Sequence, residues 1–264
     1  MFSWIIRHGE IFLKGKNKFM FENNLIRNIR DCLKKNNVKF ENVKLFRNRI
    51  LVYSEEDCSC LKNVFGISSF SRSIEIEQDI EGMKKIASGL YKKGSFRISA
   101  QRVEKDFKYN SSEINRIVGA HVVKKKKARV ELENPDVNIG IELFNKRAYL
   151  FNERINGLGG LPVGIEGNVG LLLEDKDSLI AGILMLKRGC SLSLIKKKDV
   201  DYGLLKKFCY GFELKEYKKM PDNIKAIVVN DNIDYIKKRG FKLTVFRPLI
   251  GYTRDELEKW LMYA

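Results

Sequence analysis

The segment Leu173-Glu-Asp-Lys-Asp-Ser178 lies where a phosphate-binding loop is expected, but its residue types oppose a phosphate. A short apolar run, Val169–Leu173, precedes the segment, and an apolar helical stretch, Ser178–Arg188, follows it. A strand, a tight turn and a helix start together point backbone N–H groups and a positive helix end at an anion. Such a turn favours glycine, because its backbone must curl and approach the ligand closely. Glu174 and Asp175 bring two negative charges instead, so the chain is predicted to be either an enzyme or a remnant of one.

A second set of side chains combines cations with aromatic rings, which suits binding to RNA. Lysine and arginine neutralise phosphates, and unpaired bases stack on aromatic side chains. The run Lys124–Lys127 fits a solvated helix face equally well, and both interpretations stay open. The predicted RNA-binding residues are Lys14, Lys16, Arg97, Arg102, Lys105, Phe107, Lys108, Arg116, Lys124, Lys125, Lys126 and Lys127, with Asn17 and Tyr109 beside them.

The net charge of the chain also points to a polyanionic partner. Its 264 residues contain 50 Lys and Arg against 33 Asp and Glu, which gives a charge of +17. Such an excess favours nucleic acid, because each neutralised phosphate releases counterions. A lysine-rich proteome is the alternative explanation. The hydrophobic content of 44% is sufficient for real cores.

The cysteines and histidines offer little for metal or nucleophilic chemistry. Five cysteines, an odd number, favour a reducing compartment. Cys58 and Cys60 lack the spacing of a zinc or redox pair, and the only histidines are His8 and His121. We therefore predict no metal site. No apolar run reaches the ~18 residues that span a bilayer, and the start of the chain lacks a signal-peptide pattern, so we predict a cytoplasmic protein without a membrane partner.

The elements that must position these residues fall into three segments. Residues 1–72 show the order strand, helix, two strands, helix and strand, which is typical of a ferredoxin-like module. Residues 73–155 indicate a small mixed α/β domain in which Asn110 or Ser111 caps a helix. The glycine-rich linker 156–164 marks a domain boundary. In the first segment we expect strands at Phe2–Ile6, Val43–Phe46 and Ile50–Tyr53, and helices at Asn17–Lys35 and Glu56–Val64.

Residues 165–264 alternate apolar strands with helical stretches, which predicts an open parallel sheet. The fold class is therefore an α+β N-terminal half followed by a Rossmann-like α/β domain. Ligands of such sheets bind at the carboxyl ends of the strands, where Leu173–Ser178 lies. We expect strands at Val169–Leu173, Leu192–Ile195, Ala226–Val229 and Leu243–Phe246, and helices at Ser178–Arg188, Asp199–Tyr210, Asn232–Arg239 and Arg254–Met262.

Five motifs run collinearly along nearly the whole chain: Arg7-His-Gly-Glu-Ile-Phe-Leu-Lys-Gly-Lys-Asn17, Asn134-Pro-Asp-Val137, Gly157-x-Gly-Gly-Leu-Pro-Val-Gly164, Met185-Leu-Lys-Arg-Gly-Cys190 and Arg247-Pro-Leu-Ile-Gly251. Together they resemble the motifs of the tRNA 4-thiouridine synthetases (ThiI, tRNA sulfurtransferases). The resemblance implies a THUMP RNA-binding domain over 73–155 and a PP-loop ATP pyrophosphatase domain over 165–264. It also implies a homodimer that binds the acceptor end of tRNA. In that family, ATP with Mg²⁺ adenylates a tRNA uridine, and a cysteine persulfide then delivers sulfur.

The chain departs from the family pattern at the loop and after it. The family loop reads S-G-G-x-D-S, so only Asp177 and Ser178 match it. The stretch between the loop and Arg247 is also shorter than in the family, and Val229-Asn-Asp-Asn-Ile233 lacks the family's G-E-x-x-G-Q-V segment. Cys209 lies roughly where a sulfur-carrying cysteine would be sought, but its surroundings do not match, and we interpret it as a buried residue.

We therefore predict a shortened, tRNA-binding relative of this family with no assigned catalytic residue and no cofactor. Its degenerate PP-loop, a nucleotide-binding remnant, consists of Leu173, Glu174, Asp175, Lys176, Asp177 and Ser178. The alternative is a tRNA sulfurtransferase that uses ATP with Mg²⁺, Asp177, Ser178 and Cys209, alone or with a separate catalytic partner. A third interpretation is a protein–protein adaptor whose positive charge is incidental.

Overall fold

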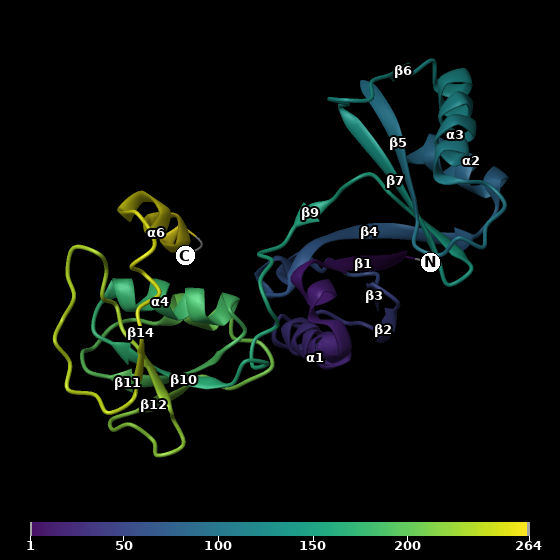
Figure 1. Cartoon of the computed structure of the whole chain (residues 1–264). Helices are drawn as coiled ribbons and strands as arrows, with labels where there is room; N and C mark the ends of the chain where they lie inside the picture. The colour runs from purple at the N-terminus through teal and green to yellow at the C-terminus, as the bar shows by residue number, and fades with distance from the viewer. Residues whose placement is uncertain (1, 263–264) are drawn as a thin grey trace. The chain divides into compact units, whose positions relative to one another are not determined.

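The computed structural model describes residues 2–262, except for the side chains of residues 12–14 (Figure 1). The chain divides into two units, and each is built from separate stretches of sequence. The first unit contains residues 1–7, 38–59 and 69–156, and the second contains residues 8–37, 60–68 and 157–264. Lys14, one of the predicted RNA-binding residues, has its side chain outside the described residues.

The first unit is built around a nine-stranded sheet with the order β2-β3-β1-β4-β8-β7-β5-β6, and β9 pairs with β4 beside this path. The long strand β4, Ile67–Glu77, runs without a break past residue 72, where the sequence predicts a domain boundary. β1 and β3 pair antiparallel, whereas β5 and β7 pair parallel. The other strands are β1 Phe2–His8, β2 Asn42–Phe46, β3 Arg49–Tyr53, β5 Ser95–Arg102, β6 Arg129–Val130, β7 Val137–Phe144, β8 Arg147–Phe151 and β9 Ile155–Asn156.

Two helices, α2 (Ile80–Leu90) and α3 (Ser111–Lys126), form a core with β5 and β7. The start of α3 follows its sequence, because the Asn110 side chain accepts from Glu113 N and the Glu113 side chain accepts from Asn110 N. This reciprocal cap satisfies donors that the helix itself leaves unpaired. Buried residues of this core include Met83, Ala87, Phe96, Ile114, Val118, Ile139 and Ile141.

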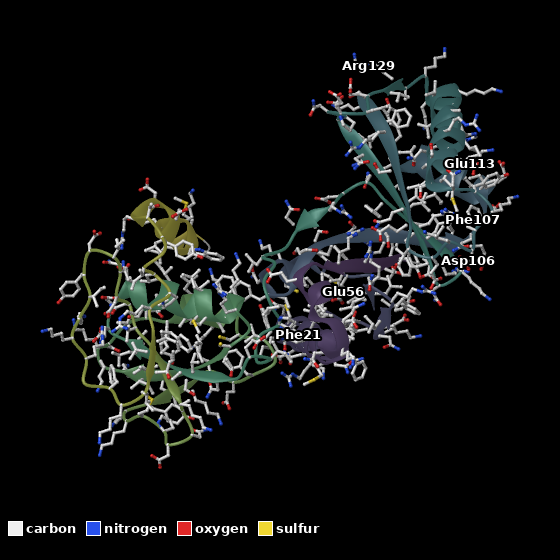
Figure 2. All side chains as sticks on the ribbon, in the orientation of Figure 1. Phe21, Glu56, Asp106, Phe107, Glu113 and Arg129 are labelled. Atoms are coloured by element: carbon white, nitrogen blue, oxygen red, sulfur yellow. The ribbon has the colours of Figure 1, made fainter. Side chains whose placement is uncertain are left out.

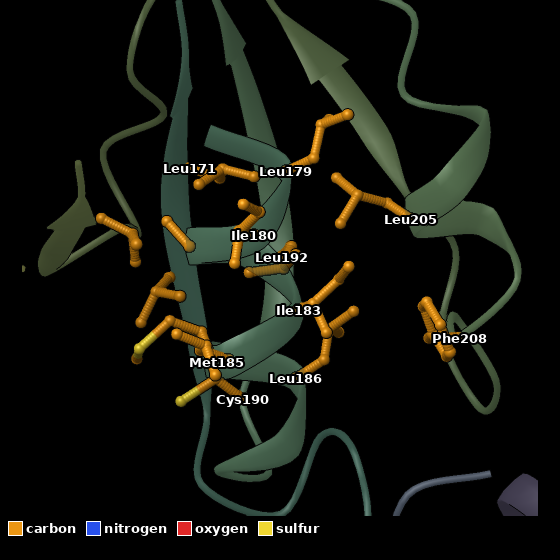
Figure 3. Packing of buried hydrophobic residues seen from close by; sticks show 14 of the residues in the cluster. Leu171, Leu179, Ile180, Ile183, Met185, Leu186, Cys190, Leu192, Leu205 and Phe208 are labelled. Atoms are coloured by element: carbon orange, nitrogen blue, oxygen red, sulfur yellow. The ribbon is translucent and has the colours of Figure 1, made fainter. Parts of the chain in front are cut away.

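The second unit contains a five-stranded parallel sheet with the order β12-β11-β10-β13-β14. Helix α4, Lys176–Lys187, packs on it, and its leucine and isoleucine side chains are buried among those of β10 and β11 (Figure 3). The strands are β10 Asn168–Leu173, β11 Ser191–Lys196, β12 Lys215–Tyr217, β13 Ala226–Val228 and β14 Thr244–Phe246. The other helices of this unit are α1 Lys18–Lys35, α5 Gly203–Lys206, α6 Arg254–Leu261 and the 3₁₀ turns Glu10–Asn17 and Ser59–Asn63.

The predicted fold class is confirmed, but several expected elements are wrong in detail. The stretch Asn232–Arg239 is an irregular turn, not a helix. Of the helix expected over Asp199–Tyr210, only α5 is helical. The strand β12 was not predicted, because its three residues, Lys, Glu and Tyr, contain no apolar run. The helix expected over Glu56–Val64 is a short 3₁₀ turn.

Residues 157–164 of the glycine-rich stretch are packed against other elements of the second unit. Gly160 has a φ of +73°, and a Cβ there would lie 2.5 Å from Lys187 O, so only glycine fits. Asn24 and Asn28 of α1 each donate a side-chain hydrogen bond to Val163 O, at 2.8 and 3.0 Å. These bonds fix the stretch to α1. Among residues 2–262, no helix is long and apolar enough to cross a membrane.

Candidate functional site

The loop between β10 and α4 has already used several of its own backbone N–H groups. Ser178 Oγ accepts hydrogen bonds from Glu174 N at 3.0 Å and from Asp175 N at 3.2 Å. Asp175 is the N-cap of α4, and its Oδ1 accepts from Ser178 N at 3.1 Å. Ser178 is fully buried, whereas Asp175 is exposed, so these hydrogen bonds lie at the boundary between the core and the surface. A phosphate would have to displace these bonds before it could use the same amides.

The Glu174 carboxylate is held by two cations of the same unit. Arg239 donates from Nη1 to Oε1 at 3.1 Å and from Nη2 to Oε2 at 2.9 Å, while Lys237 Nζ lies 3.1 Å from Oε2. The hydrogen bonds from Arg239, with that from Lys237, lower the pKa of Glu174 against the opposing effect of burial. The group is therefore ionised at neutral pH.

The same contacts explain why residues 232–239 are not helical. Residues two apart on a helix do not face each other, yet Lys237 and Arg239 both contact Glu174. Asn232 Oδ1 also accepts hydrogen bonds from Asp234 N and Tyr235 N, which closes a local turn. Asparagine side chains offer this alternative to helix formation.

Further ion pairs complete the charge balance at this edge of the sheet. Asp231, 1% exposed, contacts Arg239 Nη2 at 2.9 Å and Arg247 Nε at 3.0 Å. Asp177 accepts from Arg254 Nη1 at 2.8 Å, and Asp175 accepts from Asn230 Nδ2 at 2.6 Å. The acidic side chains that the sequence places against a phosphate are thus each bound to a donor of the protein itself.

Cys209 is buried and chemically quiet. Its side chain is 5% exposed and its thiol donates to Leu205 O at 3.0 Å. Burial raises the pKa of Cys209 to about 12, so the thiolate is scarce at neutral pH. It lies after α5 in an irregular stretch, so the expected apolar helix around it is wrong, while its burial matches the interpretation from sequence.

The loop that follows β5 gathers four of the predicted RNA-binding residues. Arg102 Nη1 donates to Phe107 O at 3.3 Å, which ties the two ends of this loop together. Phe107, labelled in Figure 2, packs edge-on against Tyr109 with 5.8 Å between the ring centroids. Lys108 Nζ lies 4.8 Å from the centroid of the Tyr109 ring. Lys105 and Lys108 are exposed, whereas both rings also pack against the core. The loop therefore presents exposed lysines beside two aromatic rings, those of Phe107 and Tyr109, which are held in place by the core.

The remaining predicted RNA-binding residues lie elsewhere. Arg97 is half-buried on β5 and donates to Leu132 O at 2.8 Å, so part of its role is structural. Arg116 is exposed on α3, and the exposed run Lys124–Lys127 ends that helix. Lysines at a helix C-terminus also stabilise the helix dipole, so both interpretations of this run keep a physical basis. Lys16 is exposed and belongs to the second unit.

Sequence reasoning missed a buried ion cluster around Glu142 on β7. Arg7 Nε lies 2.7 Å from Oε1 and Arg49 Nε lies 2.6 Å from Oε2, and Glu142 is 2% exposed. Burial acts to raise the pKa of Glu142, but the charges of Arg7 and Arg49 together hold it below its usual value. The cations Lys237, Arg239 and Arg254 around the loop were also missed. Their signal was weak, because they follow the loop at a long sequence distance.

Comparisons with known proteins match both halves of the chain. Residues 3–71 match a model described as the ThiI ferredoxin-like domain, and residues 76–153 match the THUMP domain. The chain is 33% identical over 264 residues to a probable tRNA sulfurtransferase of Mycoplasmopsis synoviae, covering 97% of this chain and 69% of that one. It is 40% identical over 205 residues to the corresponding Brevibacillus brevis protein, of which it covers 50%.

Two solved structures resemble the whole chain. A Pyrococcus horikoshii protein, PH1313, is 28% identical with a TM-score of 0.89, and the match covers 98% of both chains. A 4-thiouridine synthetase solved with RNA and bound ATP is 27% identical with a TM-score of 0.80, covering all of this chain and 85% of that one. The parallel five-stranded sheet and the N-terminal half therefore share their fold with both structures.

Proposed function

Because the chain belongs to the tRNA sulfurtransferase (ThiI) family, we propose that it binds tRNA through its N-terminal half without taking up ATP at Leu173–Ser178. The support for tRNA binding is the exposed pair Lys105 and Lys108 beside the packed aromatic rings of Phe107 and Tyr109. A family member has been solved with RNA, which is consistent with this assignment. Lysine contacts to phosphates and stacking of unpaired bases supply the binding energy.

Two adjacent lysines on the same domain provide a matched control for this RNA site. Lys92 and Lys93 are also exposed, but they precede the start of β5, whereas Lys105 and Lys108 follow its end. An eight-residue strand separates the two pairs by about 26 Å. Figure 2 shows Arg129, which pairs beside the start of β5, at the opposite end of this domain from Phe107.

The test is tRNA binding measured by fluorescence anisotropy across a salt series. Replacing Lys105 and Lys108 by Ala should reduce the slope of log affinity against log salt by about 1.4 to 1.8, because two phosphate contacts are lost. The Lys92→Ala, Lys93→Ala double variant should keep the wild-type slope. Equal effects of both pairs, or an affinity that does not depend on salt, would argue for the adaptor interpretation.

The proposed lack of ATP binding depends on the internal hydrogen bonds and ion pairs of the loop at Leu173–Ser178. The amides of Glu174, Asp175 and Ser178 are bonded internally, and the Glu174 carboxylate faces Arg239 and Lys237. ATP would compete with these contacts for the same groups and would add negative charge beside Asp177. Calorimetric titration of ATP with Mg²⁺ and tRNA present tests this, and binding tighter than about 100 µM, or −5.5 kcal/mol, would overturn it.

The second candidate function is the sulfurtransferase reaction itself. The curated relatives carry this activity in their names, and they support it more directly than they support an inactive relative. Asp177 and Ser178, at the start of α4, are the loop residues that match the family pattern. If the reaction occurs, tRNA from a deletion strain lacks 4-thiouridine. Wild-type protein then restores it and Asp177→Ala does not, whereas Lys218→Ala, at an exposed position outside the loop, does.

A further inference from the structure

A basic cavity of about 690 Å³ lies in the second unit, and none of its lining residues belongs to the loop at Leu173–Ser178 or to the residues assigned to RNA. It is formed by the end of α1, the 3₁₀ turn Ser59–Asn63, the end of α5 with the segment that follows it, and Met262 after α6. Its volume is within the range of small-molecule sites. The lining residues are Lys35, Asn36, Lys62, Asn63, Lys206, Lys207, Tyr210 and Met262.

The charge of this cavity is strongly one-sided. Four lysines line it, and none of the described lining residues is acidic. One of these lysines is paired with a carboxylate outside the lining: Asp31 Oδ2 lies 2.8 Å from Lys35 Nζ. Lysines that converge on one concave surface repel each other and concentrate a positive potential there. Lysines that only solvate a surface have no reason to converge, because convergence increases their mutual repulsion. An anion bound in the cavity would offset that repulsion.

The floor of the cavity is held in place by hydrogen bonds between distant segments. Lys35 Nζ donates to Cys209 O at 3.0 Å, and Gly211 N donates to Asp31 Oδ2 at 2.7 Å. Gly211 has a φ of +81°, which suits glycine. The Tyr210 ring, 6% exposed, lies 5.9 Å from Lys35 Nζ and forms part of the wall. The lysines are therefore carried by a fixed frame, as a binding site requires.

We propose that this cavity binds a phosphate-bearing anion, supplied either by an RNA backbone or by a free polyphosphate. Several lysine amines suit phosphate, because they act as point charges around a group with more than one negative charge. The side-chain amide of Asn63 adds a neutral donor to the lining of the cavity. The proposal is independent of the loop at Leu173–Ser178 and of the THUMP residues.

The test uses the full chain and a matched pair of double variants. Lys62→Ala with Lys206→Ala removes two cavity charges that come from separate segments. Lys218→Ala with Lys219→Ala removes the same charge from exposed positions that do not line the cavity. Circular dichroism and melting temperature check folding, and Lys62→Gln with Lys206→Gln replaces the Ala variant if the latter does not fold.

Two ligands are titrated: inorganic tripolyphosphate by calorimetry and tRNA by fluorescence anisotropy. We expect the cavity variant to weaken binding of at least one ligand about tenfold, or ~1.4 kcal/mol. The control pair should change the same affinity less than about twofold, or ~0.4 kcal/mol. A loss that includes tRNA identifies RNA backbone as the source, and a loss confined to tripolyphosphate identifies a free anion. The proposal is overturned if both pairs weaken binding equally or if neither ligand responds to the cavity lysines.

Discussion

Because Glu174 forms ion pairs with Arg239 and Lys237, removal of its charge is the most informative single perturbation of the loop. Glu174→Gln keeps the size of the side chain but removes the charge that faces Arg239 and Lys237. The Arg239 side chain is 8% exposed, so it recovers little solvation, although it keeps Asp231 at 2.9 Å. Hydrogen bonds to charged groups are worth about 1.5–3 kcal/mol each, and the amide oxygen of Gln retains part of this. Lys237, 33% exposed, is solvated enough to contribute little.

We therefore expect Glu174→Gln to lower the free energy of unfolding by about 1–2 kcal/mol at pH 7. For a chain of this size, this corresponds to a fall in melting temperature of about 2–8 °C. Urea denaturation and thermal melting at pH 7 measure the effect. Glu213→Gln is the control, because Glu213 is 79% exposed and pairs with Lys215 at 3.3 Å on the surface. Its effect should stay within about 0.5 kcal/mol.

The pH dependence of the difference in unfolding free energy between wild type and Glu174→Gln provides a second check. Because Arg239 holds the pKa of Glu174 below its usual 4.5, the ionised form is favoured in the folded state. The contribution of Glu174 to stability is therefore complete above pH 4.5 and is lost as the pH falls through the lower folded-state pKa. Wild type and Glu174→Gln should converge in acid. A variant as stable as wild type at pH 7 would refute a stabilising role of the Glu174 ion pairs. A difference in unfolding free energy that persists unchanged in acid would refute it as well.

Three further perturbations test other parts of the structure. Asp175→Ala removes the N-cap of α4 and should destabilise the second unit by about 1 kcal/mol in urea titrations; no change would mean that Asp175 does not cap the helix. Glu142→Ala removes the buried carboxylate that contacts both Arg7 and Arg49 and should cost roughly 3–5 kcal/mol, and a loss below about 1 kcal/mol would contradict the cluster. Because burial raises the pKa of Cys209 to about 12, iodoacetamide at pH 8 should leave it unmodified in the folded protein by mass spectrometry, while urea exposes it to reaction.

Much of the fold followed from local sequence patterns. Periodic apolar residues predicted α1, α3 and α4, and the cap expected at Asn110 or Ser111 forms at Asn110. Continuous apolar runs predicted β10, β11, β13 and β14. Strands inside a parallel sheet, such as β10, are covered on both faces, whereas β14 is an edge strand and is only partly buried. These elements are encoded within a few neighbouring residues, so one sequence suffices to find them.

The elements that failed are those decided by distant contacts. Asn232–Arg239 has the composition of a helix, but Lys237 and Arg239 bind Glu174, which lies far away in the sequence. The helix expected over Asp199–Tyr210 is reduced to α5, because the residues after it turn toward α1, where Lys35 binds Cys209 O. Local propensity is weaker than a set of charged hydrogen bonds and buried contacts, so tertiary structure overrides it.

The sequence by itself determined where the loop lies, which residues stand in it and that their charges oppose a phosphate. Strand, turn and helix are local, and the sign of a side chain can be read directly. The tertiary structure alone decided what those charges do. It bonds the loop amides to Ser178 and Asp175 and sets Arg239 against Glu174. The physical reason is that an ion pair depends on distance in space, and the chain fixes that distance only when its sheet has formed.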